Sequence, residues 1–78
     1  MDIKVLGPGC TRCKNLEKIV YDAVAELGVN ATITKVSDVV EIMKYGVMAT
    51  PALVVNENVE IKGRVPSKDE VKEVLAKY

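Results

Sequence analysis

The feature that most constrains the fold is a pair of cysteines, Cys10 and Cys13, between a short apolar segment and a long amphipathic one. The apolar segment, residues 3–6, predicts a strand, and Gly7-Pro8-Gly9 ends it. From residue 16 onwards apolar residues recur at the spacing of one helix face, and Gly28 follows the last of them. The stripe consists of Leu16, Ile19, Val20, Ala23, Val24 and Leu27. The pattern therefore places two thiols where a strand passes into a helix.

That position favours thiol chemistry. Cys10 falls at or just before the first helical turn, where unpaired N–H groups and the helix dipole stabilise a thiolate and lower its pKa. Arg12 and Lys14 add positive charge and are either candidates for tuning this pKa or simply solvated helix residues. Cys13 lies one turn further on, within disulfide reach. We predict Cys10 as the nucleophile and Cys13 as the resolving thiol.

Size and charge narrow the class of protein. The 78 residues suit one small domain, residues 1–78, and 11 basic residues balance 11 acidic ones. This balance argues against a nucleic-acid partner, and no apolar stretch is long enough to cross a bilayer. The first residues lead directly into a strand without a signal peptide, so we expect a cytoplasmic protein. In the cytoplasm a Cys-x-x-Cys pair is more often catalytic or metal-binding than a structural disulfide.

The rest of the chain alternates strand and helix signals. Residues 31–36 predict an outer strand, 52–55 a central strand buried on both faces, and 59–62 an edge strand after a turn at 56–58. Two further helices have capping signals. Ser37 or Asp38 caps the first, where Asp38 with Glu41 resembles a capping box, and Ser67 with Glu70 forms a second capping-box signature. The apolar residues assigned to their buried faces are Val39, Val40, Ile42 and Met43 in the first and Val71, Val74, Leu75 and Tyr78 in the second.

The predicted order is therefore βαβαββα. The first crossover implies a parallel strand pair and the tight turn an antiparallel hairpin. The expected fold is α/β, with a four-stranded mixed sheet and helices on both faces.

This order, with a Cys-x-x-Cys at the first strand–helix junction and Thr50-Pro51 before the third strand, resembles the thioredoxin fold family over the whole chain. It is most similar to the small thioredoxin- or glutaredoxin-like redox-active disulfide proteins. The resemblance implies that Cys10 is the exposed attacking cysteine and Cys13 the buried resolving one. It also implies that Pro51 is a cis-proline facing the disulfide and that the backbone of Thr50 pairs with a substrate peptide.

The chain departs from its larger relatives at three places. Gly9 precedes Cys10, with Thr-Arg between the cysteines, where long thioredoxins have Trp-Cys-Gly-Pro-Cys. Lys4 occupies the position six residues before Cys10, where many thioredoxins carry a buried acid. Residues 63–67 replace the Gly-Gly-x-Asp-like stretch typical of glutaredoxins.

Two other readings of the cysteine pair remain open. A soft-metal chaperone for Cu(I) or zinc also uses two thiolates, but such domains end in a strand, whereas this chain ends in a helical pattern. The second alternative is a structural disulfide, although closing a four-residue loop would stabilise the fold by only about 2 kcal/mol. Residues 47–49 form either an apolar lip beside the disulfide or core, and for Val47 core is favoured.

We therefore expect a monomeric thiol–disulfide oxidoreductase. Its only redox group is the Cys10–Cys13 disulfide, without a cofactor or resident metal. The expected partners are disulfide-containing proteins and a reductase or thiol donor, with neither nucleic acid nor membrane.

Overall fold

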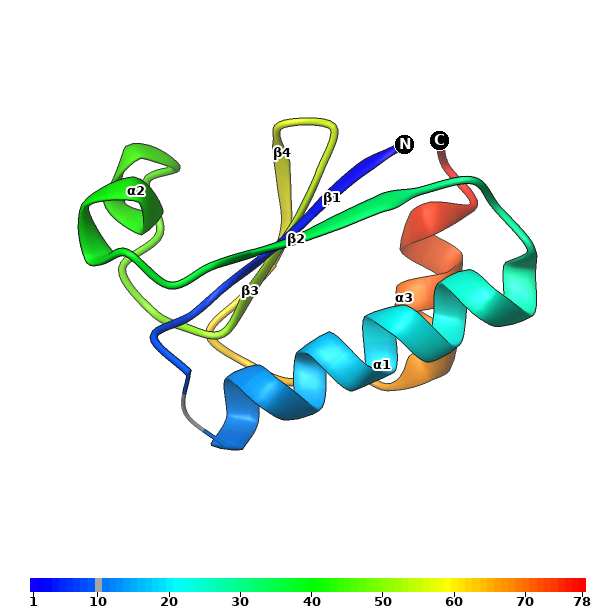
Figure 1. Ribbon diagram of the computed structural model, residues 1–78, viewed down its shortest axis with the longest axis horizontal. Helices are drawn as coiled ribbons and strands as arrows, with labels where there is room; N and C mark the ends of the chain where they lie inside the picture. The colour runs from blue at the N-terminus through cyan, green and yellow to red at the C-terminus, as the bar shows by residue number, and fades with distance from the viewer. Residues whose placement is uncertain (10) are drawn as a thin grey trace.

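Residues 1–9 and 11–78 are described in a computed structural model (Figure 1). Strands and helices follow one another in the predicted order βαβαββα. They are β1 (Asp2–Leu6), α1 (Thr11–Leu27), β2 (Thr32–Val36), α2 (Val39–Lys44), β3 (Ala52–Val55), β4 (Asn58–Lys62) and α3 (Lys68–Leu75). In these residues, no helix is both long enough and apolar enough to cross a bilayer.

The four strands form one mixed sheet in the order β2-β1-β3-β4. β1 is parallel to β2 and antiparallel to β3, with Leu6 opposite Ala52, and β3 is antiparallel to β4. The parallel pair, the hairpin and the outer position of β2 are confirmed. The two residues that join β3 to β4, Asn56 and Glu57, both have positive φ, as a tight hairpin turn requires.

Helices cover both faces of the sheet, as predicted. α1 and α3 lie side by side on one face, and α2 lies on the other (Figure 1). Because side chains alternate along a strand, Ile3 and Val5 pack toward α1 and α3, whereas Leu6 packs toward α2. β3 contributes to both halves of the core, and all four of its residues are buried. The central position of β3 is therefore confirmed.

The prediction that four apolar residues of α2 are buried is wrong for three of them. Only Ile42 is buried, at 4% exposure, whereas Val39, Val40 and Met43 are between 60% and 65% exposed. Val39 and Met43 lie on the same face of α2 as Ile42, but they border an open groove rather than the core. Val40 is exposed as well. Its cap is confirmed, because the Asp38 carboxylate accepts the Val40 N–H at 2.9 Å. Glu41 pairs with Lys44 at 2.9 Å.

The stripe expected for α3 holds for Val71, Val74 and Leu75, which are buried. Tyr78 is the exception: it lies beyond the end of the helix and is 41% exposed. Its hydroxyl donates to Glu60 and accepts from the Asn58 side chain, so it bonds to β4 rather than entering the core.

Lys4 connects the sheet to both α2 and the hairpin. Its Nζ donates to the Tyr45 hydroxyl at 2.7 Å and to Glu57 Oε1 at 2.6 Å. The hydrogen bond with Lys4 holds the pKa of Glu57 below its ordinary value, and the same bond is the main cause of a raised Lys4 pKa. A lysine six residues before Cys10 is therefore satisfied by a tyrosine and a carboxylate brought from distant parts of the chain.

We expect Glu57→Gln to flatten the pH dependence of the melting temperature on the acidic side. The Glu57 pKa is lowered in the fold, so its contribution is present above the ordinary pKa of about 4.5 and is lost as the pH falls through the folded value. The variant should melt below wild type at pH 7, and the difference should shrink progressively as the pH falls below 4.5. Glu73→Gln is the control, because Glu73 is exposed and forms no ion pair in the described part of the chain. Equal effects of both variants at pH 7 would contradict a specific role for the Lys4 contact.

Candidate functional site

Cys13 is held tightly against the end of β1. It is 1% exposed, on the inner side of the first turns of α1. A Cβ atom placed on Gly7 would lie 2.2 Å from the Cys13 Sγ and 2.8 Å from its Cβ. Only glycine can therefore occupy position 7 while Cys13 stays where it is. The predicted burial of Cys13 is confirmed, whereas the predicted nucleophile Cys10 lies outside the described residues.

Gly7 lies between two strands. Its N–H donates to the Val36 carbonyl of β2 at 2.8 Å, which extends the parallel pairing. On its other side Leu6 pairs with Ala52, and continuing that antiparallel register by one position brings Pro51 opposite Gly7. The Thr50–Pro51 peptide bond is cis, as the resemblance implied, and Pro51 is buried. Cys13 therefore packs against Gly7, and Pro51 lies beside Gly7, directly before the neighbouring strand β3.

An apolar groove of about 290 Å³ lies on the α2 side of this junction. Pro8 and Thr50 line it from the two loops, and the rest of its lining consists of Val39, Ile42, Met43, Val47 and Met48. Val47 is core, as favoured, while Met48 is 99% exposed. The exposed side of α2 therefore continues an apolar surface that begins beside the proline loop.

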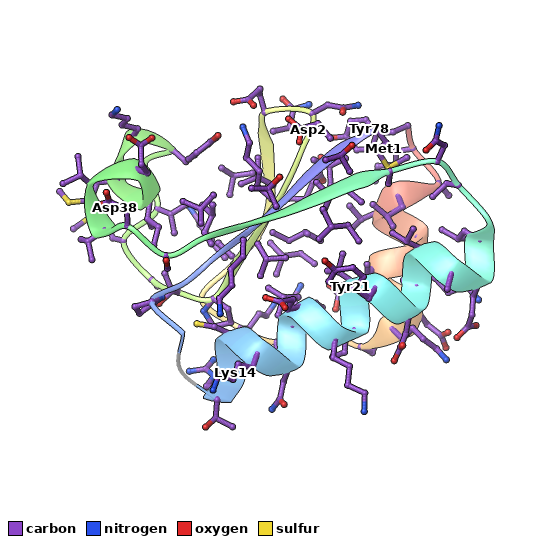
Figure 2. All side chains as sticks on the ribbon, in the orientation of Figure 1. Met1, Asp2, Lys14, Tyr21, Asp38 and Tyr78 are labelled. Atoms are coloured by element: carbon purple, nitrogen blue, oxygen red, sulfur yellow. The ribbon has the colours of Figure 1, made fainter. Side chains whose placement is uncertain are left out.

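The two basic residues near the cysteines differ in their contacts. Arg12 and Lys14 are both exposed. An Arg12 Nη2 donates to the carbonyl oxygen of Gly63 at 3.1 Å. Lys14 lies at the start of α1 (Figure 2) and has no hydrogen bond or ion pair within the described residues. Their predicted effect on the Cys10 pKa stays a prediction.

Glu17 stands out among the charged residues of α1. It lies one turn after Cys13, and residues four apart share one face of a helix. Its Oε2 is buried without a hydrogen-bond partner in the described part of the chain. A buried unpaired carboxylate oxygen is costly, so this end of the core contains an unsatisfied acceptor.

The sequence reasoning missed Gly7, the Gly63 contact of Arg12 and the buried oxygen of Glu17. A glycine three residues before a helix-start cysteine is a usable signal for close approach, whereas the other two depend on how distant loops meet. Across residues 1–9 and 11–78, no three histidine, cysteine, aspartate or glutamate side chains gather as a metal ion would need.

The sequence matches known proteins over nearly its full length. Residues 1–76 match the family model described as "Thioredoxin domain". A protein named "Thioredoxin" from Methanothermobacter thermautotrophicus is 41% identical over 76 residues, covering 97% of this chain and 99% of that one. Another named "Thioredoxin", from Methanocaldococcus jannaschii, is 40% identical over 97% of this chain and 87% of its own. A "Probable Thioredoxin" from Archaeoglobus fulgidus is 33% identical over 91% and 80%, respectively.

We expect Gly7→Ala to destabilise the protein by about 1–3 kcal/mol, the usual cost of overpacking a core. The reason is the 2.2 Å approach of the added methyl group to the Cys13 sulfur. Urea unfolding monitored by circular dichroism measures the change.

The matched comparison is the same substitution in a Cys13→Ala background. Removing the sulfur relieves the closest contact and leaves the one at 2.8 Å, so the penalty should shrink by about 0.5 kcal/mol or more. Equal penalties in the two backgrounds would show that the sulfur does not set the requirement for glycine.

Proposed function

Because this chain belongs to the thioredoxin family, we propose that it is a thiol–disulfide oxidoreductase that uses Cys10 and Cys13 to reduce disulfides in other proteins. The observation that carries the proposal is the setting of Cys13. Its sulfur is buried on Gly7 at the start of α1, beside a proline loop that borders an exposed apolar groove. That setting suits a resolving thiol, which must stay close to its partner and away from solvent until it is needed.

The first step is attack by the Cys10 thiolate on one sulfur of a substrate disulfide. A new S–S bond forms between Cys10 and the substrate, the substrate S–S bond breaks, and the leaving sulfur departs as a thiolate that takes up a proton. The start of α1 follows Cys10 directly, and the dipole and unpaired N–H groups of a helix start favour the thiolate form of an adjacent cysteine.

The second step releases the substrate. Cys13 loses its proton and its sulfur attacks Cys10, which forms the intramolecular disulfide and expels the second substrate thiolate. Two electrons and two protons have then passed from the dithiol to the substrate. We place the protein in the cytoplasm. There a reductase or a low-molecular-weight thiol reduces the Cys10–Cys13 disulfide and restores the dithiol.

The groove supplies a surface for a substrate chain. We propose that an extended peptide lies along Thr50 through backbone hydrogen bonds and places an apolar side chain against Met43 and Met48. Flexible methionine side chains adapt to different partners, which suits an enzyme that must accept many sequences around a disulfide.

The test has two parts. Mild oxidation should give a monomer lighter by two hydrogen atoms, with Cys10 and Cys13 joined in one peptide after proteolysis. The reduced protein should accelerate the reduction of insulin by dithiothreitol. Cys13→Ser should lose this activity and accumulate mixed disulfides with the substrate, since the second step is then blocked.

The controls separate this function from metal carriage. Cys10→Ser should form no mixed disulfide and no intramolecular one. A reduced protein that carries one Cu(I) per chain after purification and never reduces insulin would contradict the proposal. So would oxidation that only links separate chains.

A further inference from the structure

Arg12 makes a contact that reaches well beyond the helix to which it belongs. It lies between the two cysteines in the sequence, in the first turn of α1. Its Nη2 donates to the carbonyl oxygen of Gly63, 51 residues further along the chain, at 3.1 Å. Gly63 follows β4 directly, and β4 is the edge strand opposite β2. The contact therefore connects the start of α1 to that edge of the sheet.

Gly63 in turn packs on the proline loop. Its N–H donates to the Pro51 carbonyl at 2.9 Å. It has a φ of +76°, and a Cβ atom added there would lie 3.2 Å from the Cβ of Ala49. Gly63 therefore contacts the residues on both sides of Thr50. One residue joins Arg12 to the loop that we assign to the substrate.

We propose that Arg12 is a positioning residue that sets the width of the substrate cleft, by which we mean the space between the first turn of α1 and residues 49–51. It does so by holding that turn, through Gly63, against the proline loop. This role rests on the proposed function. A protein substrate must reach Thr50 with its backbone and the cysteine pair with its disulfide at the same time, so it depends on the spacing between them. A small disulfide needs only the cysteine and is indifferent to that spacing.

Lys14 separates this positioning role from a charge effect. It carries the same charge in the same turn of α1 (Figure 2). It makes no hydrogen bond or ion pair in the described part of the chain. Loss of charge near Cys10 changes attack on every disulfide alike, whereas loss of the Gly63 contact changes only substrates that span the cleft. The two effects are therefore distinguishable by the choice of substrate.

The experiment compares Arg12→Met with Lys14→Met, since methionine keeps an unbranched stem and removes the charge in both. The measured quantity is kcat/KM for insulin divided by the rate constant for a small aromatic disulfide. We expect Arg12→Met to lower this ratio about three- to tenfold, the range for losing one ordinary solvent-exposed hydrogen bond, mainly by raising KM. Lys14→Met should leave the ratio within about twofold of wild type.

Amide hydrogen exchange gives a readout that does not depend on activity. Arg12→Met should speed exchange of the Gly63 N–H several-fold, because the hydrogen bond to Pro51 loses the support of the guanidinium; Lys14→Met should not. An unchanged ratio together with unchanged Gly63 exchange in Arg12→Met would overturn the proposal. So would equal ratio changes in both variants. If wild type reduces neither disulfide, the proposed function and the cleft assignment both fail, while the exchange data alone still show whether Arg12 holds Gly63.

Discussion

The close approach of Cys13 to Gly7 is the contact on which the site depends. A helix can begin directly over the end of β1 only if the strand offers no side chain there, and the 2.2 Å from a hypothetical Gly7 Cβ to the sulfur leaves no room for one. Gly7 is in turn held by the Val36 carbonyl on one side and faces Pro51 on the other. One glycine thus fixes the Cys13 thiol relative to both neighbouring strands.

The two halves of the core play different parts around this contact. α1 and α3 bury most of the apolar stripe on one face of the sheet, which gives the helix carrying Cys13 a rigid base (Figure 1). The other half is small and leaves Val39, Met43 and Met48 open to solvent. These apolar side chains are exposed beside the candidate site, where the proposed substrate chain would cover them.

Much of this follows from sequence patterns because they are local. The stripe of α1 and the caps Asp38 and Ser67 depend on neighbours within a few residues, and both features were predicted, with Ser37 as the alternative to Asp38. What the patterns missed depends on distance in the fold. Val39 and Met43 border an open groove that only the assembled fold creates, and the contact of Arg12 with Gly63 joins segments 51 residues apart. The identity of the nucleophile stays a prediction, since Cys10 lies outside the described residues.

The most direct test of the account is the order in which the two thiols react. The reduced protein would be treated with a limiting amount of iodoacetamide at neutral pH, and the modified cysteine identified by mass spectrometry of its peptides. The account predicts that Cys10 is alkylated first, because a helix start favours its thiolate while Cys13 is 1% exposed against Gly7. Preferential alkylation of Cys13 would reverse the two roles and contradict the mechanism.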